Sequence, residues 1–338
     1  MARIALDAMG GDFAPQATVA GALLALAELD PAHSIQLVGG TAVVEEQLRA
    51  LLDGELSAHA GQRGRLSIVE APDVIEMTDK PSAAVRGKPN SSMAVGLRLQ
   101  AEGQSDAFVS AGNTGAQMAA SMVLLRLHAG LDRPAIVTLF PSARKPVAVL
   151  DSGANVDCAP EELVQFARLG ATYVECVLGR ANPAVGLLSI GEEPEKGNAV
   201  TKEAHQLLQA AGLNFIGNVE GRDLPAGGTE SHPVDVVVCD GFVGNVVLKF
   251  YEGIAPLMVG MLRTTGVSAQ QLEAGLKQLD YSEYGGAPLL GVKGVSIISH
   301  GKSSPRAIKN AVKVAVQAVV SGMNEQIGAR LAAAESAA

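Results

Sequence analysis

Aromatic residues, cysteines and charged residues are all scarce in this sequence. Tryptophan is absent and aromatic residues make up 3% of the 338 residues, so platforms that stack on nucleic-acid bases are not expected. The net charge of −9 also disfavours binding to a nucleic-acid backbone. The three cysteines, Cys158, Cys176 and Cys239, have no CxxC spacing, which excludes a disulfide scaffold and a structural zinc site and predicts a reducing, cytoplasmic compartment.

Long hydrophobic runs are missing as well. No apolar stretch approaches the roughly 18 residues that a membrane-spanning helix needs, and the first residues, MARIALDAMGG, lack the pattern of a signal peptide. Hydrophobic residues nevertheless make up 48% of the chain, which is enough for a large core and excludes a disordered chain.

Short β-branched runs alternate with longer helical patterns along the chain. Several runs, such as Val147–Asp151 and Val234–Cys239, are almost wholly apolar, which is typical of strands buried on both faces of a parallel sheet. We expect an α/β fold, doubly wound, with a mostly parallel sheet, helices on both faces and a single large domain over residues 1–338. The other expected strands are Ile4–Asp7, Ile35–Val38, Leu66–Val69, Ala107–Ser110, Ile136–Phe140, Val185–Ser189, Asn214–Ile216 and Val295–Ser299. The expected helices are Pro15–Leu29, Thr41–Leu52, Ser91–Ala101, Gly115–Leu127, Pro160–Val177, Asn198–Ala211 and Pro305–Gln326.

Ligands of such sheets bind beyond the carboxyl ends of the strands. The first loop of this kind, residues 7–15, contains Asp7, Gly10 and Gly11 and leads into a helix, whose N-terminus attracts anions. The loop is not GxGxxG, and no acidic residue follows the strand that ends at Val38, so dinucleotide binding is disfavoured. An anion-binding loop and a plain tight turn both remain open.

Two further loops place amides and carboxylates at strand ends. Asn113 and Thr114 could cradle a phosphate or an oxyanion, or could serve only to cap the helix that follows. The loop DSGANVD, residues 151–157, holds two carboxylates and the amide of Asn155. These carboxylates could bind a metal ion, but no cluster of histidines lies nearby in the sequence. The alternative is that Asp157 caps the helix that follows.

A lysine and an asparagine lie in two more of these loops. Lys196 stands just before a predicted helix, where its charge opposes the helix dipole and so contributes poorly to stability. It either binds an anion or is a solvated lysine that neutralises the neighbouring glutamates. Asn245 lies between a strand and a helix, in a segment that also contains Gly241 and Gly244.

Two segments add positive charge. The loop at residues 299–304 contributes His300, Lys302 and Ser303 ahead of the last helix, and its histidine could be functional or structural. Residues 78–92 contain Lys80, Arg86 and Lys88 against one acidic residue, Asp79. In a chain of net charge −9, this local basicity suits a phosphate or an acidic partner, although a surface loop is the alternative.

The familiar nucleophile and metal motifs are missing. The sequence has no GxSxG, HExxH or GxxxxGK[ST], and no cysteine stands beside a plausible base. Anion cradles without a protein nucleophile suggest a substrate that brings its own nucleophile, and inorganic phosphate is such a substrate.

Six of these segments, in this order, are similar to those of a known family. They are DAMGGDFAP (7–15), SAGNTGA (110–116), DSGANVDC (151–158), KGN (196–198), FIGNVEGRD (215–223) and DGFVGN (240–245). Over nearly its whole length the chain resembles the bacterial phosphate acyltransferases of phospholipid synthesis. Six motifs in order are highly specific, whereas one alone would not be.

The resemblance implies a homodimeric α/β/α fold related to phosphate acetyltransferases and isocitrate-dehydrogenase-like enzymes. It implies transfer of an acyl group from acyl carrier protein to inorganic phosphate, which gives acyl phosphate and needs no cofactor or metal. The acyl phosphate would pass to a membrane glycerol-3-phosphate acyltransferase, so peripheral contact with the inner face of the cell membrane is expected.

Residue roles follow from the same resemblance and from the loops above. The family's catalytic lysine and asparagine correspond to Lys196 and Asn245. The family's His-Gly loop often continues Ser-Ser-Asp, whereas this chain reads His-Gly-Lys-Ser-Ser, which leaves the roles of Lys302 and Ser303 open. The residues expected to bind substrate or phosphate are Asp7, Gly10, Gly11, Lys80, Arg86, Lys88, Asn113, Thr114, Asn155, His300 and Ser303.

The pattern of apolar residues in 249–284 predicts a projecting pair of helices. The apolar residues from Phe250 to Leu262 fall on one helix face, and Ser268 with Gln271 forms a capping box for a second helix. We expect this pair to form the edge of the dimer and to contact the membrane, with burial of both apolar stripes in the dimer as the alternative.

Two other functions remain as alternatives. A metal- and NAD-dependent decarboxylating dehydrogenase on a related fold would need a dinucleotide loop and clustered aspartates, which the sequence does not provide. A non-catalytic, membrane-associated scaffold would not need so many polar loops at strand ends.

Overall fold

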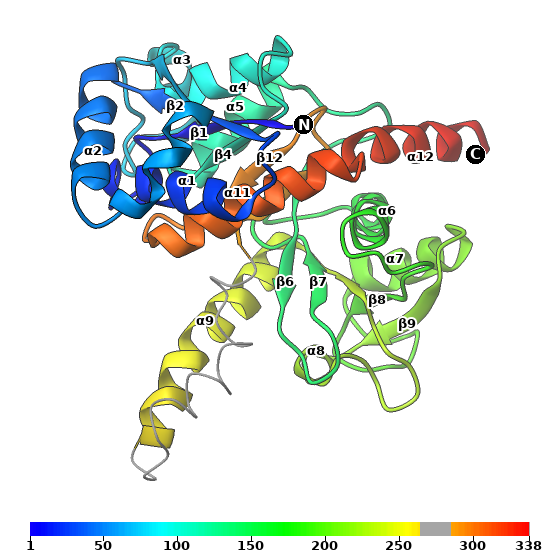
Figure 1. Cartoon of the computed structure of the whole chain (residues 1–338). Helices are drawn as coiled ribbons and strands as arrows, with labels where there is room; N and C mark the ends of the chain where they lie inside the picture. The colour runs from blue at the N-terminus through cyan, green and yellow to red at the C-terminus, as the bar shows by residue number, and fades with distance from the viewer. Residues whose placement is uncertain (264–284, 338) are drawn as a thin grey trace. The chain divides into compact units, whose positions relative to one another are not determined.

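The computed structural model describes residues 1–263 and 285–337 (Figure 1). The contacts divide the chain into two compact units, which are Met1–Ala129 with Tyr284–Ala332, and Gly130–Glu283 with Ala333–Ala338. We expected one large domain over residues 1–338. That single domain stays a prediction, within which the contacts group the residues into these two units.

The first unit is built on a mostly parallel sheet. Its strands run in the order β3 (Leu66–Glu70), β2 (Ser34–Gly39), β1 (Arg3–Asp7), β4 (Ala107–Ser110), β12 (Ser296–Ile298) and β11 (Ala287–Leu290). All neighbours pair in parallel except β11, which is antiparallel to β12. The helical segments are α1 (Gln16–Glu28), α2 (Thr41–Asp53), η1 (Ser57–Arg65), α3 (Pro81–Gly87), α4 (Ser92–Ala101), α5 (Thr114–Leu124), α11 (Pro305–Val320) and α12 (Met323–Ala337). Helices α1 and α11 pack together on one face of the sheet, and α4 and α5 cover the other.

The second unit has a five-stranded sheet of the same kind. Its order is β6 (Thr138–Phe140), β7 (Val147–Leu150), β10 (Val236–Val238), β8 (Val185–Leu188) and β9 (Phe215–Val219). Only β6 is antiparallel to its neighbour. The short strand β5 (Ala135–Ile136) precedes this sheet, and its helices are α6 (Pro160–Cys176), α7 (Ala199–Ala210), α8 (Asp223–Ala226) and α9 (Gly241–Arg263).

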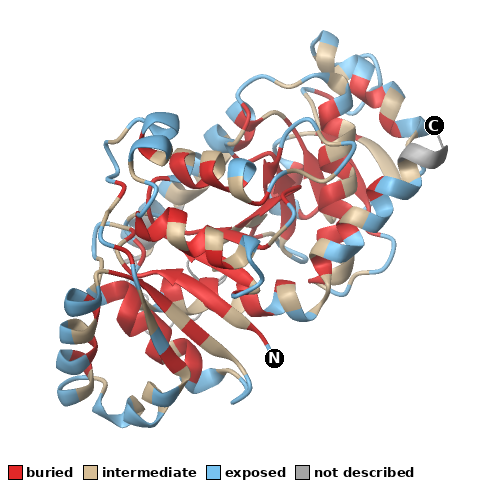
Figure 2. Cartoon of the chain, turned by 90° about the horizontal axis from the view of Figure 1, so that it is seen from above, coloured by how far each residue is buried: buried red, intermediate tan, exposed pale blue. Residues whose placement is uncertain are grey.

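Burial explains why the strands could be recognised. Every residue of β4, β7 and β10 is buried (Figure 2), as continuous apolar runs in a parallel sheet require. The predicted α/β class, with mostly parallel strands and helices on both faces, is therefore confirmed. Because parallel strands end at the same edge of a sheet, the loops after β1, β4 and β12 share one edge, and those after β7, β10 and β8 share another.

Some boundaries differ from the expectation for local reasons. The run Ile136–Phe140 forms β5 and β6 rather than one strand. The last helical pattern breaks into α11 and α12 at Gly322, whose φ of +64° lies in the left-handed region that glycine adopts without strain. Strand β11 was not predicted from the sequence, because it is short and contains Pro288, and proline is disfavoured in strands.

Helix α9 begins earlier than the expected helical pair. It starts at Gly241 instead of near residue 249, so Asn245 lies in the early turns of a helix and not in a loop. The second helix of the pair, with its capping box, lies outside the described residues. Among the residues that the structure describes, no helix is both long and apolar enough to cross a membrane.

Candidate functional site

Three of the predicted loops meet at one edge of the first unit. The Asp12 backbone N–H donates to the carbonyl oxygen of Gly301 at 2.7 Å, which joins the loop after β1 to the loop after β12. The Ser110 hydroxyl donates to Asp7 Oδ2 at 2.7 Å, which joins the loops after β1 and β4. The shared edge of β1, β4 and β12 thus brings together residues that lie far apart in the sequence.

Asp7 lies beneath this cluster and organises it. Its carboxylate is buried and also accepts the backbone N–H of Met9. Burial raises the pKa of Asp7, while hydrogen bonds from Ser92 and Ser110 oppose the rise. A β-carbon at Gly10 would lie 2.6 Å from Asp7 Oδ2, so only glycine allows the loop to close over the carboxylate. A buried acid covered in this way holds the loop from below, and the expected contact of Asp7 with substrate stays a prediction.

Asn113 also has a structural task in the first unit. Its Oδ1 accepts the Ala116 N–H and so caps α5, and its Nδ2 donates to three backbone carbonyls, those of Glu76, Met77 and Asp79. With its amide fully engaged, Asn113 fixes residues 76–79 against the start of α5. Thr114, the next residue, is exposed and remains a candidate for a substrate contact.

The basic segment of the first unit separates into two kinds of residue. Lys88 donates to Asp79 Oδ2 at 2.6 Å and to the carbonyl oxygen of Val74 at 2.8 Å. Lys80 and Arg86 are exposed at the two ends of α3, and neither makes a side-chain hydrogen bond or ion pair within the described part of the chain. The segment contains the short helix α3. The binding of phosphate or an acidic partner by Lys80 and Arg86 stays a prediction.

The loop after β12 presents one exposed ring and one buried hydroxyl group. His300 is exposed, and its Nδ1 is placed to accept the Lys302 backbone N–H at 3.1 Å. In that tautomer Nε2–H is the ring's donor. Ser303 is buried, and its backbone N–H donates to the carbonyl oxygen of His300. The histidine can therefore donate to an anion, as expected, while the main chain around it is fixed.

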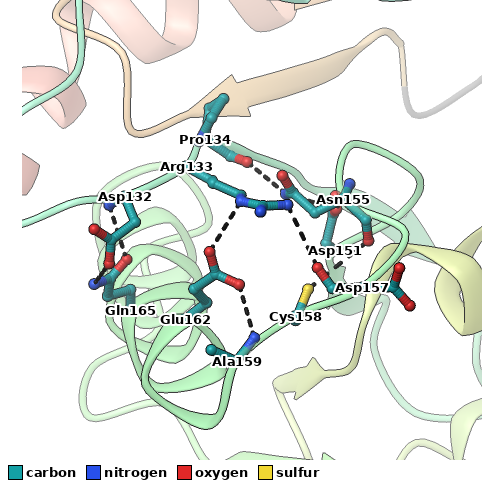
Figure 3. Close-up of polar contacts among 10 residues, drawn as sticks. All are labelled: Asp132, Arg133, Pro134, Asp151, Asn155, Asp157, Cys158, Ala159, Glu162 and Gln165. Atoms are coloured by element: carbon teal, nitrogen blue, oxygen red, sulfur yellow. Dashed lines mark hydrogen bonds and ion pairs between the residues drawn. The ribbon is translucent and has the colours of Figure 1, made fainter.

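In the second unit the loop after β7 is held by a buried carboxylate. Asp151 Oδ1 accepts the backbone N–H groups of Ile136 and Ala154. Its Oδ2 accepts the backbone N–H and the side-chain amide of Asn155, which lies beside it in Figure 3. Asn155 Nδ2 also donates to the carbonyl oxygen of Pro134 at 2.8 Å. Burial raises the pKa of Asp151 against these hydrogen bonds. Asn155, expected to bind substrate, has its amide donor committed within the fold.

An ion pair closes the same loop from outside. Arg133 Nε lies 3.0 Å from Glu162 Oε1, and Glu162 Oε2 accepts the backbone N–H of Ala159 (Figure 3). Arg133 also donates to the carbonyl oxygen of Asp157. The N-cap of α6 is Ala159, not Asp157 as the sequence suggested, because Glu162 reaches back to satisfy the backbone there.

Asn245 is placed by close contact between α9 and the Asp151 loop. A β-carbon at Gly241 would lie 2.5 Å from Asp151 Oδ2, and one at Gly244 would collide with the carbonyl oxygen of Asp151. These glycines let the helix begin directly against the loop. Asn245 then lies beside Gly153, which has φ of +128° and would place a β-carbon 3.4 Å from Asn245 Cβ.

Lys196 lies on a loop at the same edge of the second unit, after β8. Its backbone N–H donates to the carbonyl oxygen of Glu193 at 3.0 Å, and its own carbonyl accepts the Ser189 hydroxyl at 3.2 Å. The main chain is held while the side chain is exposed. Within the described residues, neither the Lys196 ammonium nor the Asn245 amide has a hydrogen-bond or ion-pair partner of its own.

This pair gives the second unit an electropositive group and an amide donor at one edge of its sheet. An ammonium can neutralise a phosphate or a departing thiolate, and an amide N–H can stabilise a developing oxyanion. The cysteines nearby are poor nucleophiles, because burial raises the pKa of Cys158 to about 12 and that of Cys239 well above its ordinary value. In the described part of the chain, no three histidine, cysteine, aspartate or glutamate side chains group as metal ligands would.

Sequence reasoning missed several residues that support the site. Asn218 and His205 are buried polar residues linked by a hydrogen bond of 2.9 Å. Asn218 belongs to the FIGNVEGRD motif but lies within strand β9. The sequence around a polar residue in a strand does not indicate which distant residue it will hydrogen-bond. His205 lies in the middle of α7, with only the helical pattern around it.

Solved structures share this fold. A phosphotransacetylase from Streptococcus pyogenes matches with a TM-score of 0.64 and 15% identity, covering 94% of each chain. A branched-chain phosphotransacylase from Enterococcus faecalis matches with a TM-score of 0.60 and 16% identity, covering 94% of this chain and 99% of that one. The chain therefore has the fold of the phosphotransacylases.

Sequence comparison gives the particular family. A family model described as fatty acid synthesis protein matches residues 2–326. The chain is 50% identical to a phosphate acyltransferase of Desulforamulus reducens over 333 residues, covering 96% of this chain and 95% of the relative. It is 49% identical to a phosphate acyltransferase of Heliobacterium modesticaldum, covering 94% of each. The chain belongs to this phosphate acyltransferase family and is an enzyme of that type, which confirms the predicted resemblance.

Proposed function

We propose that this enzyme transfers a fatty acyl group from acyl carrier protein to inorganic phosphate and so supplies acyl phosphate for phospholipid synthesis. The observation that carries the proposal is the pair of exposed side chains, Lys196 and Asn245, at the shared edge of β8 and β10. Their polar groups have no partner among the described residues, while the other expected amides, those of Asn113 and Asn155, are committed to the fold.

The reaction needs no protein nucleophile. An oxygen of hydrogenphosphate forms the new bond to the thioester carbonyl carbon, and the carbon–sulfur bond breaks. The proton of the hydrogenphosphate passes to the departing thiolate, so the carrier protein leaves as its thiol. In this mechanism Asn245 donates to the carbonyl oxygen as it becomes an oxyanion, and Lys196 neutralises phosphate or the departing thiolate. One such oxyanion donor is typically worth about 10²–10³ in rate, and holding the reactants together supplies much of the remainder.

The first unit carries candidate contacts for anionic substrates of its own. Gly11 and Thr114 lie in its strand-end loops, His300 is exposed beside them, and Lys80 and Arg86 are exposed on the segment that Asn113 anchors. These cations and donors suit phosphate and the acidic surface of a carrier protein. Asp7, Gly10, Lys88 and Asn155 shape the loops from within, and Ser303 is buried behind His300.

The proposed pathway ends at a membrane. Acyl phosphate carries a long apolar chain, so its transfer to a membrane glycerol-3-phosphate acyltransferase would be aided by peripheral contact of a homodimer with the inner face of the cell membrane. Helix α9 supports this idea, because Phe250, Leu257 and Met261 on it are more than half exposed. On its other side Val247, Leu248 and Tyr251 pack on the core of the second unit.

A trapping assay tests the reaction and the donor together. The purified protein is mixed with inorganic phosphate and either acyl carrier protein loaded with a long acyl chain or acetyl-coenzyme A, and acyl phosphate is captured with hydroxylamine. We expect phosphate-dependent acyl hydroxamate from the long-chain carrier thioester and much less from acetyl-coenzyme A. Preference for acetyl-coenzyme A would reject the proposed donor, and the absence of hydroxamate with either donor would reject acyl transfer to phosphate.

A further inference from the structure

The segment 215–223 belongs to the site's neighbourhood but takes no part in the proposed chemistry. It contains β9 and ends at Asp223, the first residue of α8. Inside it stands Asn218, a polar residue that is only 3% exposed. Buried amides must find hydrogen-bond partners or destabilise the fold, so the partners of Asn218 reveal what the segment supports.

One partner is the loop that carries Lys196. Asn218 Nδ2 donates to the carbonyl oxygen of Glu193 at 2.8 Å. The same carbonyl oxygen accepts the backbone N–H of Lys196 at 3.0 Å. A carbonyl oxygen accepts two hydrogen bonds, so the buried amide and the lysine main chain share one acceptor.

The other partner fixes the orientation of the amide. Since Nδ2 of Asn218 is the donor to Glu193, its Oδ1 must accept, and His205 Nδ1 lies 2.9 Å away as the matching donor. His205 Nε2 then accepts from Gln209 Nε2 at 3.1 Å. His205 is 3% exposed and packs edge-on against Phe215, at a ring distance of 5.1 Å. Asn218 is thus held by the buried ring of His205 on α7, which itself packs against Phe215 of β9.

The Lys196 loop has little else to define it. Residues Glu192 to Lys196 are all exposed, so side-chain packing contributes little there. Apart from the shared carbonyl, the main chain is tied by the Ser189 hydroxyl to the Lys196 carbonyl oxygen at 3.2 Å. Gly197 follows with φ of +108°, a conformation that glycine adopts without strain.

We infer that Asn218 is a positioning residue for Lys196: its buried amide fixes the Glu193 carbonyl and thereby the main chain from which the lysine side chain extends. The inference rests on the proposed role of Lys196. Asn218 touches neither substrate nor reacting atoms, and it acts only through the loop. Its effect on turnover must therefore disappear once the lysine is gone.

A double-mutant cycle tests this dependence. Asn218→Leu removes the amide at nearly constant volume, and we expect kcat to fall roughly 10- to 100-fold, a loss that in Lys196→Ala protein shrinks to less than about twofold. The matched control is Asn214→Leu, which removes a similar amide-to-carbonyl bond, from Asn214 to Asn182, elsewhere in the unit. It should leave kcat unchanged. An unchanged kcat in Asn218→Leu, or an equal loss with and without Lys196, would overturn the inference.

A second measurement does not depend on activity. Hydrogen exchange of the backbone amides in residues 190–197 should speed up in Asn218→Leu and stay as in the wild type in Asn214→Leu. Unchanged exchange would reject positioning even if turnover fell. Wild-type turnover of Lys196→Ala would instead reject the proposed role of Lys196, while faster exchange would still support the tie between Asn218 and the loop. If Asn218→Leu does not fold, Asn218→Asp serves, because it keeps an acceptor for His205 and turns a carboxylate oxygen, in place of the amide donor, toward the carbonyl oxygen of Glu193.

Discussion

Lys88 donates to Asp79 Oδ2 at 2.6 Å and so is bound into the turn that precedes α3. This hydrogen bond lowers the pKa of Asp79 below its ordinary value. The same ammonium reaches the carbonyl oxygen of Val74. Of the three cations in the basic segment, Lys88 therefore holds the segment in place, while Lys80 and Arg86 stay exposed.

Substitution should separate these two roles. We predict that Lys80→Gln with Arg86→Gln raises the Michaelis constant for the acyl carrier substrate several-fold and flattens its dependence on sodium chloride, because long-range attraction is screened by salt. Lys88→Gln should instead loosen residues 74–79, which limited proteolysis would detect. A salt profile like that of the wild type in the double variant would show that Lys80 and Arg86 are ordinary surface residues.

Lys196 and Asn245 should carry the chemistry. Each alanine variant is expected to lose at least about 10²-fold in kcat, the scale of one lost oxyanion donor, with an unchanged circular dichroism spectrum. Lys202→Ala, which removes an exposed lysine from α7, is the matched control and should keep wild-type turnover. Near wild-type turnover in both active-site variants would contradict the assignment.

Transfer should proceed without an acyl-enzyme. The thiols of Cys158 and Cys239 donate to the carbonyl oxygens of Asn155 and Asp151, and burial raises the pKa of both, so neither supplies a thiolate near neutral pH. Mass spectrometry of protein quenched after mixing with acyl carrier thioester, in the absence of phosphate, should find the unmodified mass. A stoichiometric acyl adduct would refute direct transfer.

The exposed stripe of α9 should bind either a membrane or a second copy of the chain. We predict that wild-type protein co-sediments with anionic phospholipid vesicles and that Leu257→Glu with Met261→Glu abolishes binding, because charge opposes insertion of an apolar face. Light scattering on the same variant tells the two roles apart: an intact dimer supports membrane contact, and loss of the dimer assigns the stripe to the interface. Failure of the wild-type protein to co-sediment with the vesicles would disprove the membrane contact.

Glu28 should make the first unit sensitive to acid. It accepts hydrogen bonds from Lys309 and Lys313 at 2.7 Å, which lower its pKa from 4.5 to about 2. A carboxyl group with a depressed pKa adds stability above its unfolded pKa and loses it as pH falls toward the folded value. Because the pair is exposed, Glu28→Gln should lower the free energy of unfolding by only about 1 kcal/mol near neutral pH. In urea unfolding the difference between wild type and variant should shrink between about pH 4.5 and pH 2, and a constant difference would contradict the ion pairs.

Most of the strands and helices could be predicted from the sequence, because apolar runs and turn residues are local signals. A run such as Val147–Leu150 is apolar at every position, and every position is buried, so the parallel sheet could be inferred from composition alone. Glycines after strands marked the strand ends at Gly10 and Gly241, although the second of these begins helix α9. The two-unit division could not be read in this way, because it depends on which strands pair across long stretches of chain, and no linker of distinctive composition separates the units.

The sequence by itself determined which residue types stand after each strand, and therefore the family and the list of candidate groups. Tertiary structure decided which of those groups are still available to a substrate. Asn113, Asn155 and Asn245 carry the same amide, yet the first is committed to carbonyls of residues 76–79 and the second to Pro134 and Asp151, while the third is exposed on α9. A side chain's chemistry is encoded at its own position, but its hydrogen-bond partners arrive from elsewhere in the chain, and a buried polar group that has found them has none left for a ligand.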